Sequence, residues 1–234
     1  MTKALSKAQR EERRTFLKLI AAAGAGAALV VGISLAAVTM MPMATLPGAT
    51  TIAGRLAESG LDTKAMTLIG AGAPDVLVVG STDCVHCQAF VAEGLDPLLE
   101  AAKTEGWTVA YLPLPTGPAS IVSTHALGLV RDAADPEAAL RATYALSSEI
   151  RNEGLPADKQ AARLAELTGD AGLVGRWSEP VPEAVSAYGQ KVASVFAVQG
   201  TPSIYVQSAD GQEVRMFSGF SGASRIVDQV RAHR

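Results

Sequence analysis

The chain has 234 residues, which is room for one ordinary domain with an accessory segment. At 48% hydrophobic and 18% charged residues, it belongs to neither the disordered nor the fibrous class of proteins. The net charge of −3 is unevenly distributed, because the first 41 residues carry six basic and two acidic side chains and the rest carry 14 basic and 21 acidic ones. An acidic folded part argues against nucleic acid as a partner, since phosphate binding needs a basic face.

The amino-terminal segment is typical of an export signal or a membrane anchor. Residues 1–18 form a basic region, and residues 19–41 contain no charged side chain, which is long enough to cross a bilayer as one helix. Within the basic region, Arg13-Arg14 followed by Phe16-Leu17-Lys18 and a stretch rich in Gly and Ala resembles a twin-arginine signal. A plain signal anchor, in which the two arginines supply only positive charge, remains an alternative.

Both alternatives place the rest of the chain outside the cytoplasm. We expect the apolar segment to remain as an anchor in the inner membrane, or to be cleaved so that a soluble periplasmic protein is released. The compartment is oxidising in either case, so a cysteine pair becomes a disulfide there unless another protein reduces it.

One α/β domain is expected after the membrane segment. Residues 42–74 are rich in Gly, Ala and Thr and are expected to be a linker with a small helix, whereas residues 75–234 form the domain. The unbroken apolar run at residues 76–79 predicts a strand covered on both faces. A helix from residue 84 to about 103, kinked at Pro97, and a strand over residues 107–112 should follow, with the two strands parallel.

A helical insertion is predicted at about residues 114–182. This stretch has no strand pattern, and Asp135-Pro136 and Leu155-Pro156 each place a proline at the start of an alanine-rich helix. The elements predicted after the insertion are a helix over residues 183–196, a strand over 203–207, a turn at 208–211, a strand over 213–217 and a closing helix over 224–232.

The candidate catalytic residues lie at the end of the first predicted strand. The sequence Cys84-Val85-His86-Cys87 places a C-x-x-C motif in the first turn of a helix. Free backbone N–H groups and the positive end of the helix dipole stabilise a thiolate there. We expect Cys84 to be the nucleophile and Cys87 the resolving thiol, because a second thiol one turn along can attack a mixed disulfide that the first has formed.

Two charged residues beside the nucleophile have opposite expected effects. A protonated His86 favours the Cys84 thiolate and makes the oxidised form a better oxidant, whereas Asp83 opposes this effect by its proximity. The alternatives are that His86 is an ordinary exposed helix residue and that Asp83 is a solvated cap.

Other roles for the two cysteines are less well supported. A purely structural disulfide across four residues would remove little chain entropy, on the order of 2 kcal/mol. A c-type haem needs a histidine after the second cysteine, and residue 88 is Gln. Zinc needs about four ligands, and beyond the motif only His125 and His233 could contribute. We therefore expect no cofactor and no metal.

The motif and the later Gly200-Thr201-Pro202 before a predicted strand hairpin resemble the thioredoxin fold. With the helical insertion and the Val198-Gln199 approach, residues 75–234 are most similar to the periplasmic Dsb-type thiol–disulfide interchange proteins, especially the catalytic domain of the DsbC/DsbG group, with DsbA-like enzymes next. This resemblance implies that Pro202 is cis and faces Cys84, and that Thr201 offers its backbone to an extended substrate segment.

The sequence also departs from this family. Val85 stands where many relatives carry proline or glycine, and Asp83 stands where thioredoxin carries tryptophan, so the redox potential does not transfer. The roughly thirty residues between the membrane segment and the domain are too few for the dimerisation domain of DsbC-like isomerases.

These patterns predict a periplasmic thiol–disulfide oxidoreductase that uses Cys84, His86 and Cys87 for catalysis and Thr201 and Pro202 for substrate binding. Oxidase or interchange activity is favoured over isomerase activity, and isomerase activity over reductase activity. The expected partners are exported cysteine-containing proteins, a membrane redox partner that recycles the pair, and the membrane itself if the amino-terminal helix is retained. The alternative is a non-catalytic thioredoxin-like envelope binding module with a permanent disulfide.

Overall fold

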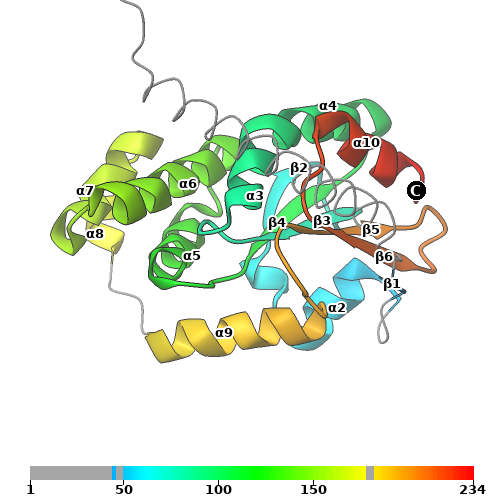
Figure 1. Ribbon diagram of the computed structural model, residues 1–234, viewed down its shortest axis with the longest axis horizontal. Helices are drawn as coiled ribbons and strands as arrows, with labels where there is room; N and C mark the ends of the chain where they lie inside the picture. The colour runs from blue at the N-terminus through cyan, green and yellow to red at the C-terminus, as the bar shows by residue number, and fades with distance from the viewer. Residues whose placement is uncertain (1–43, 46–49, 178–181) are drawn as a thin grey trace, which may run out of the picture. The chain divides into compact units, whose positions relative to one another are not determined.

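A six-stranded sheet in the order β1-β6-β5-β3-β4-β2 forms the centre of the computed structural model, which describes residues 44–45, 50–177 and 182–234 (Figure 1). Strands β3 and β4 are parallel, and the other neighbouring pairs are antiparallel. The strands are β1 (Ala44–Thr45), β2 (Met66–Ile69), β3 (Val76–Gly80), β4 (Val109–Pro113), β5 (Ser203–Gln207) and β6 (Val214–Ser218).

Helices cover both faces of the sheet (Figure 1). Helices α3, α4 and α10 and the helical insertion pack on one face, whereas α2 and α9 pack on the other. The helices are α2 (Ile52–Ser59), η1 (Asp62–Lys64), α3 (Val85–Ala89), the π-helical turn η2 (Phe90–Gly94), α4 (Leu95–Glu105), α5 (Pro118–Val130), α6 (Pro136–Glu153), α7 (Ala157–Thr168), α8 (Leu173–Arg176), α9 (Pro182–Val195) and α10 (Ala223–Arg231).

Strand β3 is buried along its whole length, as its apolar run predicts. Val76 and Val78 join the core on one face of the sheet, and Leu77 and Val79 join the core on the other. Because successive side chains of a strand point to opposite faces, a strand between two helical layers needs apolar residues at every position. The strand, helix and parallel strand expected from the sequence are all present.

The helix after β3 changes its pitch directly before Pro97. A π-helical turn, η2, separates α3 from α4, and Pro97 lies in the first turn of α4. A proline ring excludes the carbonyl group four residues earlier, here that of Glu93, and offers no N–H to it, so a widened turn directly before the proline removes the conflict. The irregular turn of this helix therefore lies directly before Pro97, and the kink at Pro97 stays a prediction. Gly106, with φ 75°, ends the helix.

The helical insertion is confirmed for the part of it that the structure describes, where α5 to α8 follow one another without a strand. Asp135 begins α6 by accepting a hydrogen bond from the N–H of Ala138 at 2.9 Å, and Pro136 is in its first turn. Pro156 instead precedes α7 as its N-cap. Leu140 and Leu146 of α6 are fully buried in the same core as β3 and β4, so the insertion is packed onto the sheet.

Residues 50–74 differ from the linker that their composition predicts. The Thr51 hydroxyl accepts a hydrogen bond from the N–H of Gly54 at 2.9 Å and so caps α2, whose Ile52 is fully buried. Strand β2 pairs antiparallel with β4 and forms an edge of the sheet, with Met66 buried and Thr67 exposed. A strand of four residues is too short for its alternation to be distinguished from a small helix, and this is why the sequence favoured a linker.

The two amino-terminal predictions, the basic region at residues 1–18 and the apolar segment at residues 19–41, lie outside the described residues. Within the described ranges, the structure contains no helix with the length and apolar character needed to span a membrane.

Candidate active site

Cys84 lies at the junction of β3 and α3, where it is the N-cap residue of the helix. Its backbone is extended, with φ −88° and ψ 122°, and its N–H donates a hydrogen bond to the Ser81 carbonyl at 3.1 Å. Its thiol is partly exposed and donates to the carbonyl of Thr201 at 3.1 Å. The sulfur therefore lies between the free N–H groups of a helix start and the loop before β5.

Cys87 lies one turn further along α3 and has no exposed surface. Its sulfur accepts a hydrogen bond from the N–H of Ser81 at 3.4 Å. Both cysteines are free thiols, so the structure represents the reduced pair. The Cys84 sulfur can be reached by another protein, whereas the Cys87 sulfur can be reached only by Cys84.

The surroundings separate the acidities of the two thiols. Burial opposes ionisation of Cys84, but hydrogen bonds from the Thr201 side chain and from Cys87 and His86 outweigh it, and the pKa of the Cys84 thiol is lowered. Burial raises the pKa of the Cys87 thiol to about 12. The accessible sulfur is thus the one that ionises readily, which is the division of roles that disulfide exchange requires.

This difference predicts a pH profile for thiol alkylation of the reduced protein. We expect Cys84 alone to react at neutral pH, with a midpoint below the value of about 8.5 for a free cysteine. The Cys84→Ser variant, which retains only the buried thiol, should react slowly at every pH at which it is folded. Mass spectrometry of the alkylated protein over a pH series measures both, and a Cys84 midpoint at or above the free value would contradict the prediction.

The same two shifts predict opposite effects of pH on stability. A lowered pKa in the folded state means that the reduced protein gains stability as pH rises through the folded pKa of Cys84 toward the unfolded value. The raised pKa of Cys87 means that stability falls as pH rises from the unfolded cysteine value toward about 12. Urea unfolding of the reduced protein at a series of pH values should therefore show a rise followed by a fall. The oxidised protein should lack the rise, and its stability should fall only above about pH 10, where the buried tyrosines of both forms begin to ionise on unfolding.

Asp83 is held by the insertion rather than by solvent. Its carboxylate accepts a hydrogen bond from the N–H of Ser120 at 3.3 Å, at the start of α5, and lies 3.6 Å from a guanidinium nitrogen of Arg151, near the end of α6. Gly117, the N-cap residue of α5, has no side chain to cap the helix, and a Cβ there would lie 2.6 Å from the carboxylate. Asp83 thus caps a distant helix, and Arg151 offsets its negative charge beside Cys84.

Two further residues of this turn are held by the insertion. The Ser81 hydroxyl is hydrogen-bonded to the hydroxyls of Thr116 at 2.7 Å and Ser120 at 2.8 Å. The Thr82 carbonyl accepts from Gln88 at 3.1 Å and from Arg151 at 3.3 Å. Residues 81–83 are therefore fixed by groups from α5 and α6 as well as by their own helix.

The loop before β5 reaches the cysteine pair through the Thr201 carbonyl, which accepts the hydrogen bond from the Cys84 thiol. The peptide bond between Thr201 and Pro202 is cis, and the Pro202 carbonyl accepts a hydrogen bond from the N–H of Gly219 at 2.8 Å. His86 is exposed on the outer side of α3, next to Val85, whose side chain is 66% exposed. The structure thus brings the two cysteines and the loop before β5 together. The His86 side chain lies outside this group, on the exposed surface of α3.

The other two histidines lie elsewhere. His125 packs edge-on against Trp177, with 5.0 Å between the ring centroids, and His233 lies 3.4 Å from a guanidinium nitrogen of Arg215. Within residues 44–45, 50–177 and 182–234, no three His, Cys, Asp or Glu side chains are grouped so that they could hold a metal ion.

Sequence reasoning missed the contribution of α6 to this site. Arg151 and Tyr144, both on α6, contact the turn that carries the cysteines. The sequence signal that could have indicated this contribution was Tyr144. It lies on the buried face of α6, and a buried tyrosine hydroxyl needs a hydrogen-bond partner.

Comparisons with known proteins bear on the fold. No family model matches the chain, and no curated protein matches it. A linker-deletion variant of ScsC from Proteus mirabilis is similar with a TM-score of 0.50 and 17% identity, over 100% of this chain and 98% of that one. The α-DsbA1 protein of Wolbachia pipientis is similar with a TM-score of 0.55 and 11% identity, over 73% of this chain and 89% of that one. The chain therefore shares the fold of these structures, a thioredoxin-like fold with a helical insertion.

Proposed function

We propose that this protein is a thiol–disulfide oxidoreductase that acts in the periplasm on exported cysteine-containing proteins. The observation that carries the proposal is the inequality of the two thiols. Cys84 is accessible and has a lowered pKa, whereas Cys87 has no exposed surface and its pKa is raised to about 12. A disulfide kept only for stability needs no such difference.

The proposed reaction transfers a disulfide from this protein to its substrate. A substrate thiolate attacks the sulfur of Cys84, the bond between Cys84 and Cys87 breaks, and its electron pair stays on Cys87. A second substrate thiolate then attacks the substrate sulfur of the mixed disulfide and releases Cys84 as a thiolate. The substrate has lost two electrons and the pair has gained them, so a membrane redox partner must reoxidise the pair.

This direction is favoured by the hydrogen bonds to Cys84. Interactions that stabilise its thiolate stabilise the reduced form of the protein, and they make the oxidised form a better donor of its disulfide. A protonated His86 would add to this effect. Oxidase or interchange activity is therefore proposed ahead of isomerase activity.

Substrate binding is proposed at the loop before β5. The Thr201 carbonyl lies beside the Cys84 sulfur, and Pro202 follows it at the start of the strand. An extended substrate segment could pair with this backbone and bring its own cysteine to Cys84. The amino-terminal segment would keep the domain at the outer surface of the inner membrane, or direct its export and then be removed.

Equilibrium titration of the purified protein in glutathione buffers, with the thiols counted by alkylation, tests the proposal. A potential near or above about −200 mV is expected, because disulfide donors lie in this range. A potential below about −300 mV, with no transfer to a reduced test protein, would indicate a permanent disulfide and support the binding-module alternative.

A further inference from the structure

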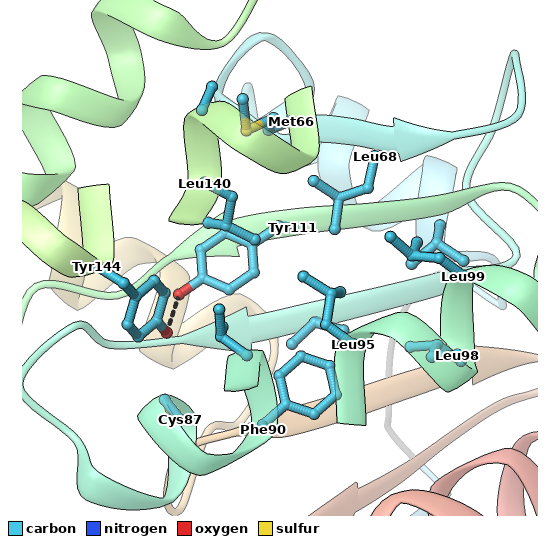
Figure 2. Packing of buried hydrophobic residues seen from close by; sticks show 14 of the residues in the cluster. Met66, Leu68, Cys87, Phe90, Leu95, Leu98, Leu99, Tyr111, Leu140 and Tyr144 are labelled. Atoms are coloured by element: carbon cyan, nitrogen blue, oxygen red, sulfur yellow. Dashed lines mark hydrogen bonds between the residues drawn. The ribbon is translucent and has the colours of Figure 1, made fainter. Parts of the chain in front are cut away.

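Two buried tyrosines lie behind the cysteine pair. Tyr111 of β4 and Tyr144 of α6 point toward each other, and 2.9 Å separates their hydroxyl oxygens (Figure 2). Their rings meet edge-on, with 6.4 Å between the centroids, in the same core cluster as Cys87. The active-site chemistry described above makes no use of this polar pair in an apolar core.

Ser81 connects the tyrosine pair to Cys87. Its N–H donates to the Cys87 sulfur at 3.4 Å, and its carbonyl accepts from the Tyr144 hydroxyl at 3.5 Å. The backbone of Ser81 therefore contacts both the buried sulfur and the phenol. The side chains of Tyr144 and Cys87 also interact with each other, and this interaction contributes to the raised pKa of Tyr144. The opposite, accessible side of the pair is Cys84.

Both phenols remain protonated. Burial, together with the neighbouring Tyr111 and Cys87, holds the pKa of the Tyr144 phenol well above its ordinary value, and burial does the same for Tyr111. Tyr144 is thus a hydrogen-bond donor and not a base at any pH at which a folded protein works.

The proton of Tyr144 has a weak acceptor in the reduced protein. The hydroxyls of Tyr111 and Tyr144 are hydrogen-bonded to each other, and either can be the donor. We consider the arrangement in which Tyr111 donates to the Tyr144 oxygen. This leaves the Tyr144 proton for the Ser81 carbonyl, whose distance of 3.5 Å is long for a hydrogen bond between oxygens. A negative charge on the adjacent sulfur would attract this proton more strongly.

We propose that Tyr144 takes part in disulfide exchange by donating a hydrogen bond to the Cys87 sulfur when that sulfur becomes negatively charged. In the step concerned, an incoming thiolate forms a bond to the Cys84 sulfur, the Cys84–Cys87 bond breaks, and its electron pair goes to Cys87. A thiolate then forms at a sulfur with no exposed surface, and the N–H of Ser81 and the hydroxyl of Tyr144 replace the solvent that would otherwise stabilise it. The inference rests on the proposed function and assigns a further residue to the same site.

The test compares two tyrosine variants of the full chain in the oxidised form. Tyr144→Phe removes the proposed donor. Tyr205→Phe is the matched control, because Tyr205 is also buried but belongs to the core on the other face of the sheet, where its hydroxyl donates to the Phe196 carbonyl at 2.7 Å. Each variant loses one buried hydroxyl, so losses of stability should be similar.

The readout is the rate at which excess dithiothreitol reduces the disulfide, followed by alkylation of the freed thiols. We expect Tyr144→Phe to slow the reaction about tenfold, as is typical for loss of a hydrogen bond to a charged group, and Tyr205→Phe to leave the rate unchanged. Equal rates in both variants and the unmodified protein would overturn the inference, and so would equal slowing in both variants, because it would indicate a general loss of rigidity.

Tyr111→Phe provides a second test if Tyr144→Phe does not fold. It leaves the Tyr144 hydroxyl in place but removes the group that orients it, so a smaller slowing is expected, and an unchanged rate would count against the inference. The outcome of this test is independent of the redox titration proposed above. A potential below about −300 mV would contradict the proposed function, but dithiothreitol would still reduce the disulfide, so the rates of the variants could still be compared.

Discussion

Replacing Cys87 with serine is expected to trap complexes between this protein and its substrates. Cys84 remains partly exposed, its pKa is still lowered, and it can form mixed disulfides, but the buried thiol that would release them is gone. Cells that express the full-length Cys87→Ser variant should contain a ladder of larger species on non-reducing gels. The species should collapse to one band when a reductant is added.

The matched control for this trapping experiment is Cys84→Ser. The remaining thiol of Cys87 has no exposed surface and a pKa of about 12, so it should form no mixed disulfides with proteins. If both variants gave ladders of the same intensity, the mixed disulfides would not be formed by the Cys84 sulfur. A single band from the Cys87→Ser variant in an oxidising periplasm would count heavily against an exchange function.

Replacing Gly80 with alanine is expected to destabilise the protein by about 1–3 kcal/mol, the usual cost of overpacking a core. Gly80 ends β3, and a Cβ on it would lie 2.7 Å from the Tyr111 hydroxyl oxygen and 3.0 Å from a carbon of its ring. Tyr111 cannot move aside freely, because it is buried and hydrogen-bonded to Tyr144. Urea denaturation of the variant and the unmodified protein measures the difference.

Gly128→Ala is the corresponding control. Gly128 lies within α5, and a Cβ there would meet no atom within 4 Å. Alanine is favoured over glycine in a helix, so this variant should gain about 0.5–1 kcal/mol. If Gly80→Ala proved as stable as the unmodified protein, the close packing of Tyr111 against β3 would be disproved.

The features that could be predicted from the sequence are those encoded locally. The apolar run of β3 and the cysteine motif after it predicted the strand, the helix and the parallel strand β4, and β5 has the predicted bounds of Ser203–Gln207. Proline after a capping residue marked the start of α6 at Asp135. Each of these signals needs only neighbouring residues, because periodicity and capping are properties of a single element.

The features that could not be predicted depend on contacts between distant parts of the chain. Strand β2 becomes a strand because β4 offers it a free edge, which its four residues do not reveal. Asp83 meets Arg151 across 68 positions, and Tyr111 meets Tyr144 across 33. On an alanine-rich helix such as α6, several faces are apolar enough to be buried. The sequence therefore does not indicate which of its polar side chains reach the cysteine pair.

The pairing of Asp83 with Ser120 and Arg151 means that the reactive turn and the inserted helices are not separable modules. A minimal version of the protein, trimmed to the sheet and the helices on its two faces, would keep both cysteines but would leave an uncompensated carboxylate next to the nucleophile. Changes in α5 or α6 would alter the groups that hold Asp83 while the motif itself stays constant. Variation in the insertion thus reaches the reactive turn without any substitution in the turn itself.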